Sequence, residues 1–249
     1  MNVALISLAC MFLGALIGVL LREFLPEHHM STESRDVIKL GTGLIATQAA
    51  LVLGLMVSSA KTQFDSVSNS LTEGAASRIL LDRNLAHYGP EAQPVRDQLR
   101  AAFTAKIEHL WPKAGSHKRA TDDDDVTDME NVGDLLRALT PANEPQKILK
   151  DRVLELYGKG NEHRWELNSK VHAEVPMVFI VVLIFWFTVL FSAFGVLAPN
   201  NVTVKVVMFL CMMSVAAGIM LILDVARPFE GVIRVSRAPY DNALRSLGR

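Results

Sequence analysis

Apolar residues in this chain are concentrated in four long runs that contain no Asp, Glu, Lys or Arg. These runs cover residues 3–21, 40–60, 175–198 and 206–223. A helix needs about 20 predominantly apolar residues to cross the hydrocarbon core of a bilayer, and each run has roughly that length. Buried helices of soluble domains rarely carry uncharged stretches this long. The pattern therefore predicts an all-α integral membrane protein with four transmembrane helices.

The four runs divide the chain into parts with different environments. Residues 1–60 hold the first two spans and a short connecting loop, and residues 175–227 hold the third and fourth spans. Between them, residues 61–174 form a helical extramembrane domain, and residues 228–249 form a C-terminal tail. Lys and Arg near the spans are more frequent on the side of the middle segment and the tail. The positive-inside rule then predicts that the middle domain and both termini are cytoplasmic.

The middle segment shows the periodicity of amphipathic helices. No proline interrupts residues 40–88, so the second span is expected to continue out of the membrane as one helix that ends at Gly89 and Pro90. A second helix is expected to end near Trp111. A further helix is expected to begin with Asn143 as its N-cap and to run towards the third span.

Two segments lie outside this pattern of amphipathic helices. The stretch "KAGSHKRATDDDDVTD" lacks the alternating oxygen ligands and the glycine of a calcium-binding EF-hand loop, so it is expected to be a solvated loop. A short helix around residues 135–139 is expected after it. In the tail, "VIRVS" alternates apolar and polar residues. This is compatible with an extended segment that docks on the bundle or on a neighbouring subunit, but an ordinary tail is the favoured interpretation.

Signals for enzymatic or cofactor chemistry are absent from the sequence. It contains no Gly-rich phosphate loop, no paired-cysteine zinc pattern and no Ser-centred nucleophile elbow. The two cysteines, Cys10 and Cys211, lie in membrane runs and are expected to be free thiols. A net charge of −1 opposes general nucleic-acid binding. We therefore expect no catalytic site, no cofactor and no nucleic-acid partner.

Histidines give two weak candidates for metal binding. His28 and His29 adjoin Glu27 in the first loop, where a metal site and ordinary surface residues are both possible. His163, Glu166 and His172 do not share one helical face at ligand spacing, so we expect them to be surface groups. The sequence predicts no metal site.

The spans differ in the residues that they offer to neighbours. Gly14 and Gly18 in the first span have the four-residue spacing that lets two helices pack closely. The third span carries large aromatic and aliphatic side chains nearly all round, as expected of a helix that faces lipid. The second span is different, because small and polar residues recur along it.

One face of the second span supports two hypotheses. Residues at steps of four, three, four and four share this face, and a glutamine broadens it: Gly43, Thr47, Ala50, Gly54 and Ser58, with Gln48. Small residues let helices pack closely, and hydroxyls bond across the contact. Alternatively, several copies of the face surround a path on which hydroxyls and Gln48 replace part of an ion's hydration shell. The residues alone leave both explanations open.

The end of the fourth span offers a candidate gate or latch. Asp224 and Arg227 are three residues apart on a helix and are placed to form an ion pair at the interface, and Pro228 then ends the helix. A salt bridge that only anchors the span at the membrane surface is the favoured interpretation, and the gate or latch is the alternative.

Two stretches carry a resemblance to a known family. "LPEHHMSTESRDVIKLGTGLIATQAALVLGL" and "RPFEGVIRVS" resemble the bacterial inner-membrane proteins described as bestrophin-like domain proteins, formerly a domain of unknown function. The similarity extends over nearly the whole chain and includes "ILLDRNLAHYGPEA". Family members often have an acidic residue before the matching arginine, whereas this chain has Ala226, so a latch here would depend on Asp224.

The resemblance implies kinship with bestrophins, which are oligomeric anion channels. It implies a multi-pass protein of the inner membrane, a homo-oligomer in the lipid bilayer, and small inorganic ions as the transported species. The favoured hypothesis is passive conduction along the second span. The alternative is a non-conducting membrane scaffold or sensor whose cytoplasmic helical domain binds a partner protein.

Overall fold

The chain forms helices that belong to two compact units. The computed structural model describes residues 2–26, 31–112, 122–171, 177–199, 201–229 and 231–248. One unit, here called the membrane unit, comprises Met1–Gln63 and Glu174–Arg227, and the other, the helical unit, comprises Phe64–Ala173 and Pro228–Arg249. The described residues contain helices, turns and loops and no β-strand. The predicted all-α class is confirmed.

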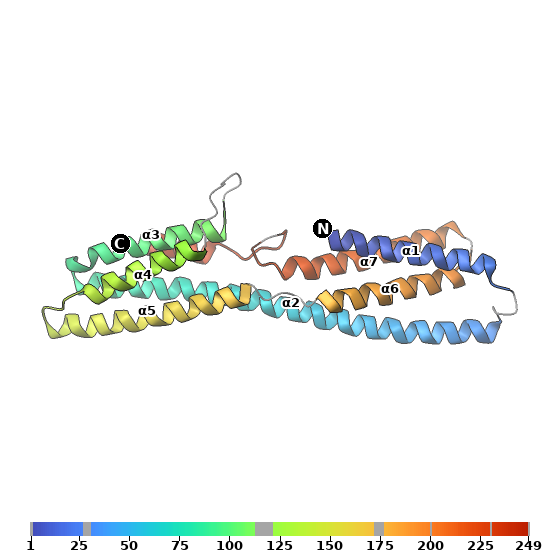
Figure 1. Cartoon of the computed structure of the whole chain (residues 1–249), viewed down its shortest axis with the longest axis horizontal. Helices are drawn as coiled ribbons and strands as arrows, with labels where there is room; N and C mark the ends of the chain where they lie inside the picture. Colours follow the sequence, from blue (N-terminus) through green and yellow to red (C-terminus); the bar gives the residue numbers. More distant parts are fainter. Residues whose placement is uncertain are drawn as a thin grey trace. The chain divides into compact units, whose positions relative to one another are not determined.

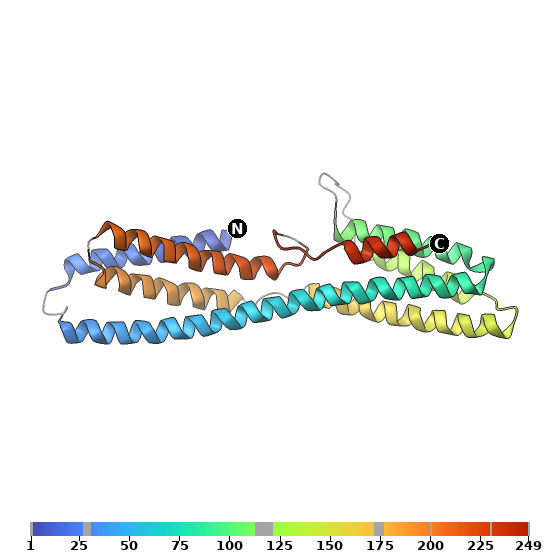
Figure 2. The same ribbon diagram turned by 180° about the vertical axis from the view of Figure 1, so that it is seen from behind.

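The membrane unit contains the four predicted spans. They are α1 (Asn2–Phe24), the first part of α2 (Thr32–Tyr88), α6 (Met177–Leu197) and α7 (Val202–Val225). Each of these helices is long and apolar enough to cross a membrane. Within the unit they run side by side, as Figures 1 and 2 show from opposite sides. The prediction of four long apolar helices is confirmed.

Helices α1 and α6 approach each other most closely where both carry glycine. A Cβ atom placed on Gly14 would lie 2.6 Å from the backbone oxygen of Thr188, and one on Gly18 would overlap the backbone oxygen of Ser192. From the other side, a Cβ on Gly195 would lie 3.1 Å from the Cα of Gly18. Only residues without a side chain allow the two backbones this separation.

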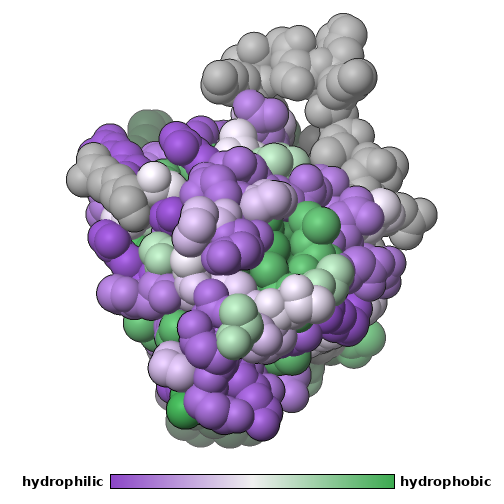
Figure 3. Space-filling view, turned by 90° about the vertical axis from the view of Figure 1, so that its left-hand side faces the viewer, coloured by the Kyte–Doolittle hydropathy of each residue, from purple (hydrophilic) through white to green (hydrophobic). Residues whose placement is uncertain are grey.

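The helical unit is a bundle with a conventional apolar core. It contains the rest of α2, a short 3₁₀ turn (Pro90–Ala92), α3 (Gln93–Leu110), α4 (Asp122–Ala138), α5 (Glu144–Val171) and α8 (Ala238–Ser246). The apolar face of α2 in this unit is buried at Val67, Leu71 and Leu85. The face of this unit in Figure 3 is mostly hydrophilic around a smaller apolar area, as expected of a surface in water.

Two helix ends in this unit follow from local chemistry. Gly89 has a φ of +130°, a backbone conformation that L side chains rarely adopt, and α2 ends beside it. At the start of α5, the Asn143 Oδ1 atom accepts a hydrogen bond from the Gln146 backbone N–H at 2.9 Å, which confirms the predicted N-cap. The Gln146 Oε1 atom in turn accepts from the Ala142 N–H at 2.7 Å.

The acidic stretch is helical from its first aspartate, so the loop prediction is wrong there. Helix α4 begins at Asp122 and has 17 residues, whereas a short helix around residues 135–139 was expected. Carboxylates are favoured in the first turn of a helix, because the unpaired N–H groups there carry partial positive charge. The basic part of the stretch, residues 113–121, lies outside the described residues.

The tail is also more ordered than the sequence indicated. Residues 232–236 are irregular, but Val235 is 4 % exposed and its carbonyl oxygen accepts a hydrogen bond from Trp111 Nε1 at 3.3 Å. After it, α8 buries Tyr240 and Ala243 in the bundle, and the Tyr240 ring stacks on Phe103 at 4.9 Å. The docking of this segment on the bundle is therefore observed, and the favoured interpretation of an ordinary tail is wrong.

Substituting Gly18 by alanine is expected to destabilise the membrane unit. The added methyl group overlaps the Ser192 carbonyl, so the helices must separate, and overpacking of this kind costs about 1–3 kcal/mol. Thermal unfolding of the purified protein in detergent measures the effect. Gly218→Ala in α7 is the matched control, because a Cβ atom placed on Gly218 has no atom within 4 Å and alanine is the better helix former. Equal unfolding temperatures for the two variants would contradict the assignment.

Candidate functional site

The small-residue face of α2 is turned away from the rest of its own chain. All six residues predicted for it are exposed: Gly43, Thr47, Gln48, Ala50, Gly54 and Ser58. Another side of the same helix carries Ala49, Met56 and Ala60, which are buried with residues of α6 and α7. At about 100° per residue, the small residues lie about 140° around the helix axis from this buried set. Gln48 lies between the two sets on the other, wider side of the helix.

The space in front of this face is open in the single chain. No described atom lies within 4 Å of a Cβ placed on Gly43 or Gly54, in contrast to Gly14 and Gly18 of α1. The Thr47 hydroxyl donates to the Gly43 carbonyl oxygen at 2.9 Å, which satisfies its hydrogen within the helix. Within the described residues, Gly43 and Gly54 are therefore not packed against another helix of the same chain, and the role of the face stays a prediction.

Gln48 carries a primary amide, which needs hydrogen-bond partners inside a membrane. It lies near the middle of the uncharged run and is exposed, and its amide has no hydrogen-bond partner in the part of the chain that the structure describes. An amide at this depth requires partners, since the hydrocarbon core supplies none. The described part of the chain supplies no such partner, and a role of Gln48 in conduction stays a prediction.

The predicted latch residues lie where α7 ends. The Arg227 backbone N–H donates to the Asp224 carbonyl oxygen at 3.1 Å in the final turn. Asp224 is half-buried and Arg227 is exposed. In the loop that follows, the carbonyl oxygen of the buried Pro228 accepts from the Val235 N–H at 2.8 Å. A role of these residues in gating stays a prediction.

The weak metal candidates gain no support from their positions. Within the described residues, no three His, Cys, Asp or Glu side chains are grouped as a metal site would require. His163 and Glu166 lie closer than their spacing had indicated, with 3.7 Å between Nδ1 and Oε2. Glu27, His28, His29 and His172 lie outside the described residues. Cys10 and Cys211 are free thiols.

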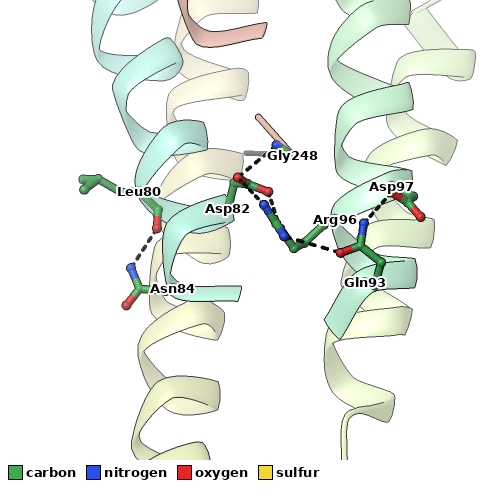
Figure 4. Close-up of polar contacts among 7 residues, drawn as sticks. All are labelled: Leu80, Asp82, Asn84, Gln93, Arg96, Asp97 and Gly248. Carbon is green, nitrogen blue, oxygen red and sulfur yellow. Dashed lines mark hydrogen bonds and ion pairs between the residues drawn. The ribbon is translucent and has the colours of Figure 1, made fainter. Parts of the chain in front are cut away.

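The helical unit contains a buried ion pair that was not predicted from the sequence (Figure 4). Asp82 on α2 accepts two hydrogen bonds from Arg96 on α3, at 2.8 Å from Nε and 3.1 Å from Nη2. The two side chains are only 2 % and 11 % exposed. The hydrogen bond that Arg96 donates to Asp82 is the largest cause that raises the pKa of Arg96 above its ordinary value. A charged residue between the apolar Leu81 and Leu85 was the available signal, because a carboxylate on a buried face needs a partner.

The same carboxylate holds the end of the chain. The Gly248 backbone N–H donates to Asp82 Oδ2 at 3.2 Å, and Gly248 has a φ of +82° that favours glycine. Leu247, one residue earlier, is 2 % exposed in the core of the bundle. Asp82 thus joins three segments, α2, α3 and the residues after α8. This arrangement is a structural anchor rather than a site that presents groups to a ligand.

Four apolar helices joined to a helical bundle define a multi-pass, all-α membrane protein. The bestrophin-like domain matches residues 9–240, which is nearly the whole chain. The chain therefore belongs to the bestrophin-like domain family.

Solved structures show the same fold at low sequence identity. One variant of a bacterial bestrophin homologue from Klebsiella pneumoniae matches with a TM-score of 0.68 and 12 % identity over 98 % of each chain. A second variant of that protein matches with a TM-score of 0.68 and 14 % identity, over 98 % of this chain and 95 % of that one. No curated protein matches this chain in sequence.

Replacing Asp82 by asparagine is expected to loosen the C-terminal segment. Removing one partner of a buried ion pair costs about 3–5 kcal/mol, because the other charge stays buried without compensation. Thermal unfolding and the rate of trypsin cleavage after Arg237 and Arg245 in folded protein measure the effect. Asp97→Asn is the control, since Asp97 is an exposed carboxylate on α3 that accepts from Gln93 at 2.9 Å. Unchanged cleavage in the Asp82 variant would show that the carboxylate does not anchor the tail.

Proposed function

We propose that this protein is a homo-oligomeric channel that conducts small ions passively across the bacterial inner membrane, with α2 nearest the symmetry axis. The observation that carries the proposal is the exposed small-residue face of α2 together with the exposed Gln48 beside it, whose amide has no partner within the described part of its own chain. Membership of the bestrophin-like family supports it, because bestrophins are oligomeric ion channels.

The mechanism requires several copies of the chain. A single subunit with one small-residue face has too little polar surface to enclose a wet path. Cyclic symmetry brings the same face of every copy to a common axis, so that each residue of the face becomes a ring. The absence of side chains at Gly43 and Gly54 keeps such a path wide at two levels, while Gln48 lies at the contact between neighbouring copies or at the edge of the path.

The face would act on ions by replacing water. From Gly43 to Ser58 it carries no charged residue, so hydroxyl oxygens, backbone carbonyls and the Gln48 amide would take over part of the hydration shell. Selection along this part of the path would depend on radius and hydration. Kinship with bestrophins favours anions for the transported species.

The orientation and the gate complete the proposal. By the positive-inside rule, the helical unit and both termini lie in the cytoplasm. Asp224, Arg227 and Pro228 then lie at the cytoplasmic end of α7 and are candidates for a gate. The competing function is a non-conducting scaffold or sensor that binds a partner through its helical unit, and electrical recording separates the two.

Substitutions on the exposed face are expected to alter conduction. In planar bilayers under asymmetric KCl, Gly54→Leu should abolish or strongly reduce the single-channel current, because an isobutyl group from every copy narrows and dewets the path. Gln48→Leu should change permeation more than it changes the unfolding temperature. Gly218→Leu on α7 is the control, since a Cβ atom placed on Gly218 also has no atom within 4 Å.

The outcomes discriminate between the functions when oligomeric state is measured on the same samples. An unchanged current in assembled Gly54→Leu protein would exclude this residue from any narrow part of the path. A lower unfolding temperature with unchanged permeation would identify Gln48 as a packing residue. Silence of the folded, oligomeric wild-type protein across voltage, pH and calcium would support the scaffold.

A further inference from the structure

The uncharged face of α2 is preceded by an exposed ion pair on the same side of the helix. Asp36 lies seven residues before Gly43 and Lys39 lies four residues before it. Steps of seven and four residues correspond to about two turns and one turn of a helix, so both side chains share the face of Gly43. The Lys39 Nζ and Asp36 Oδ1 atoms are 2.9 Å apart, and the side chains are 63 % and 59 % exposed.

The pair differs from three other charged residues near that end of the spans. Arg22 at the end of α1 donates to the Ala198 carbonyl oxygen and thereby caps α6. Glu33 and Arg35 lie on α2 but are about 80° around the helix from Gly43, on opposite sides of it. Asp36 and Lys39 are therefore the charged residues that continue the small-residue face at the N-terminal end of α2.

We propose that Asp36 and Lys39 keep this entrance of the channel electrically balanced, so that loss of either charge shifts the charge selectivity. This inference rests on the proposed function, because it needs α2 of every copy to lie around one axis. Each copy then adds one carboxylate and one ammonium group to the same entrance, and the two charges cancel. Rings of acidic side chains favour cations and rings of basic side chains favour anions. Since the face beyond is uncharged, the balance at the entrance decides which sign of ion is concentrated there.

The proposal predicts opposite effects for the two residues. Lys39→Gln leaves a ring of carboxylates and should raise the permeability ratio of K⁺ to Cl⁻. Asp36→Asn leaves a ring of ammonium groups and should lower that ratio. Each change is expected to be about two- to fivefold, the size appropriate to a solvent-exposed charge. The double variant, which is again neutral at this position, should return close to the wild-type ratio.

The experiment is the reversal potential of purified full-length protein in planar bilayers under a KCl gradient. Recording at about 0.1 M and about 1 M mean salt adds an electrostatic signature, because the screening length falls from about 10 Å to about 3 Å between them. The differences between the variants should shrink at high salt. A change caused by altered structure would not follow salt in this way.

Lys147→Gln in the helical unit is the matched control. Lys147 and Glu144 form an exposed pair with the same three-residue spacing, and Lys147 has the same 63 % exposure as Lys39. Loss of this charge should leave the permeability ratio unchanged. An effect equal to that of Lys39→Gln would overturn the inference.

Two further results would overturn it, and they are distinguishable. If the wild-type protein conducts but both entrance variants keep its permeability ratio, the inference fails and the proposed function stands. If the folded, oligomeric wild-type protein carries no current, the proposed function fails and the inference fails with it.

Discussion

The hydrocarbon core of a bilayer is the constraint from which most of this structure follows. It offers no hydrogen-bond partner to a backbone, so uncharged segments that cross it must be helices. It also removes the usual reason for helices to associate, since lipid tails are as apolar as leucine. Close contact then depends on shape. In the membrane unit, Gly14 and Gly18 meet the backbone of α6 near Gly195, at separations that no side chain allows.

The helical unit is held together by a different effect, the burial of apolar side chains. In water, burial of apolar surface drives association. Phe103, Trp111 and Tyr240 pack as a group of rings that joins α3 and the C-terminal segment. The buried Asp82 is tolerated because Arg96 and the Gly248 N–H satisfy its oxygens. One pair of charges therefore specifies how three segments meet, and the apolar core supplies most of the stability.

The candidate site on α2 is part of neither the glycine contact in the membrane unit nor the apolar core of the helical unit. The small-residue face of α2 is exposed, and no described atom lies within 4 Å of a Cβ placed on Gly43 or Gly54, although a membrane helix usually uses such residues to pack. Polar groups at membrane depth are costly unless they are satisfied, so they are retained where a neighbouring copy, water or an ion satisfies them. This cost is why we consider the face functional, and it is also why the proposed function needs an oligomer.

Local patterns in the chain were sufficient for the four spans, the continuation of the second span into a 57-residue helix and the N-cap at Asn143. These features depend on residues that are close in sequence, through apolar run length, helical periodicity and capping. The start of α4 at Asp122 was also a local feature, but the acidic run was misread as a solvated loop. Only the folded chain decided which side of α2 is buried, which carboxylate pairs with Arg96, and that the tail forms α8 against the bundle. Those outcomes depend on contacts between residues as far apart in sequence as Asp82 and Gly248. Helical periodicity shows which face of each helix is apolar, but it does not determine which two helix faces pack together.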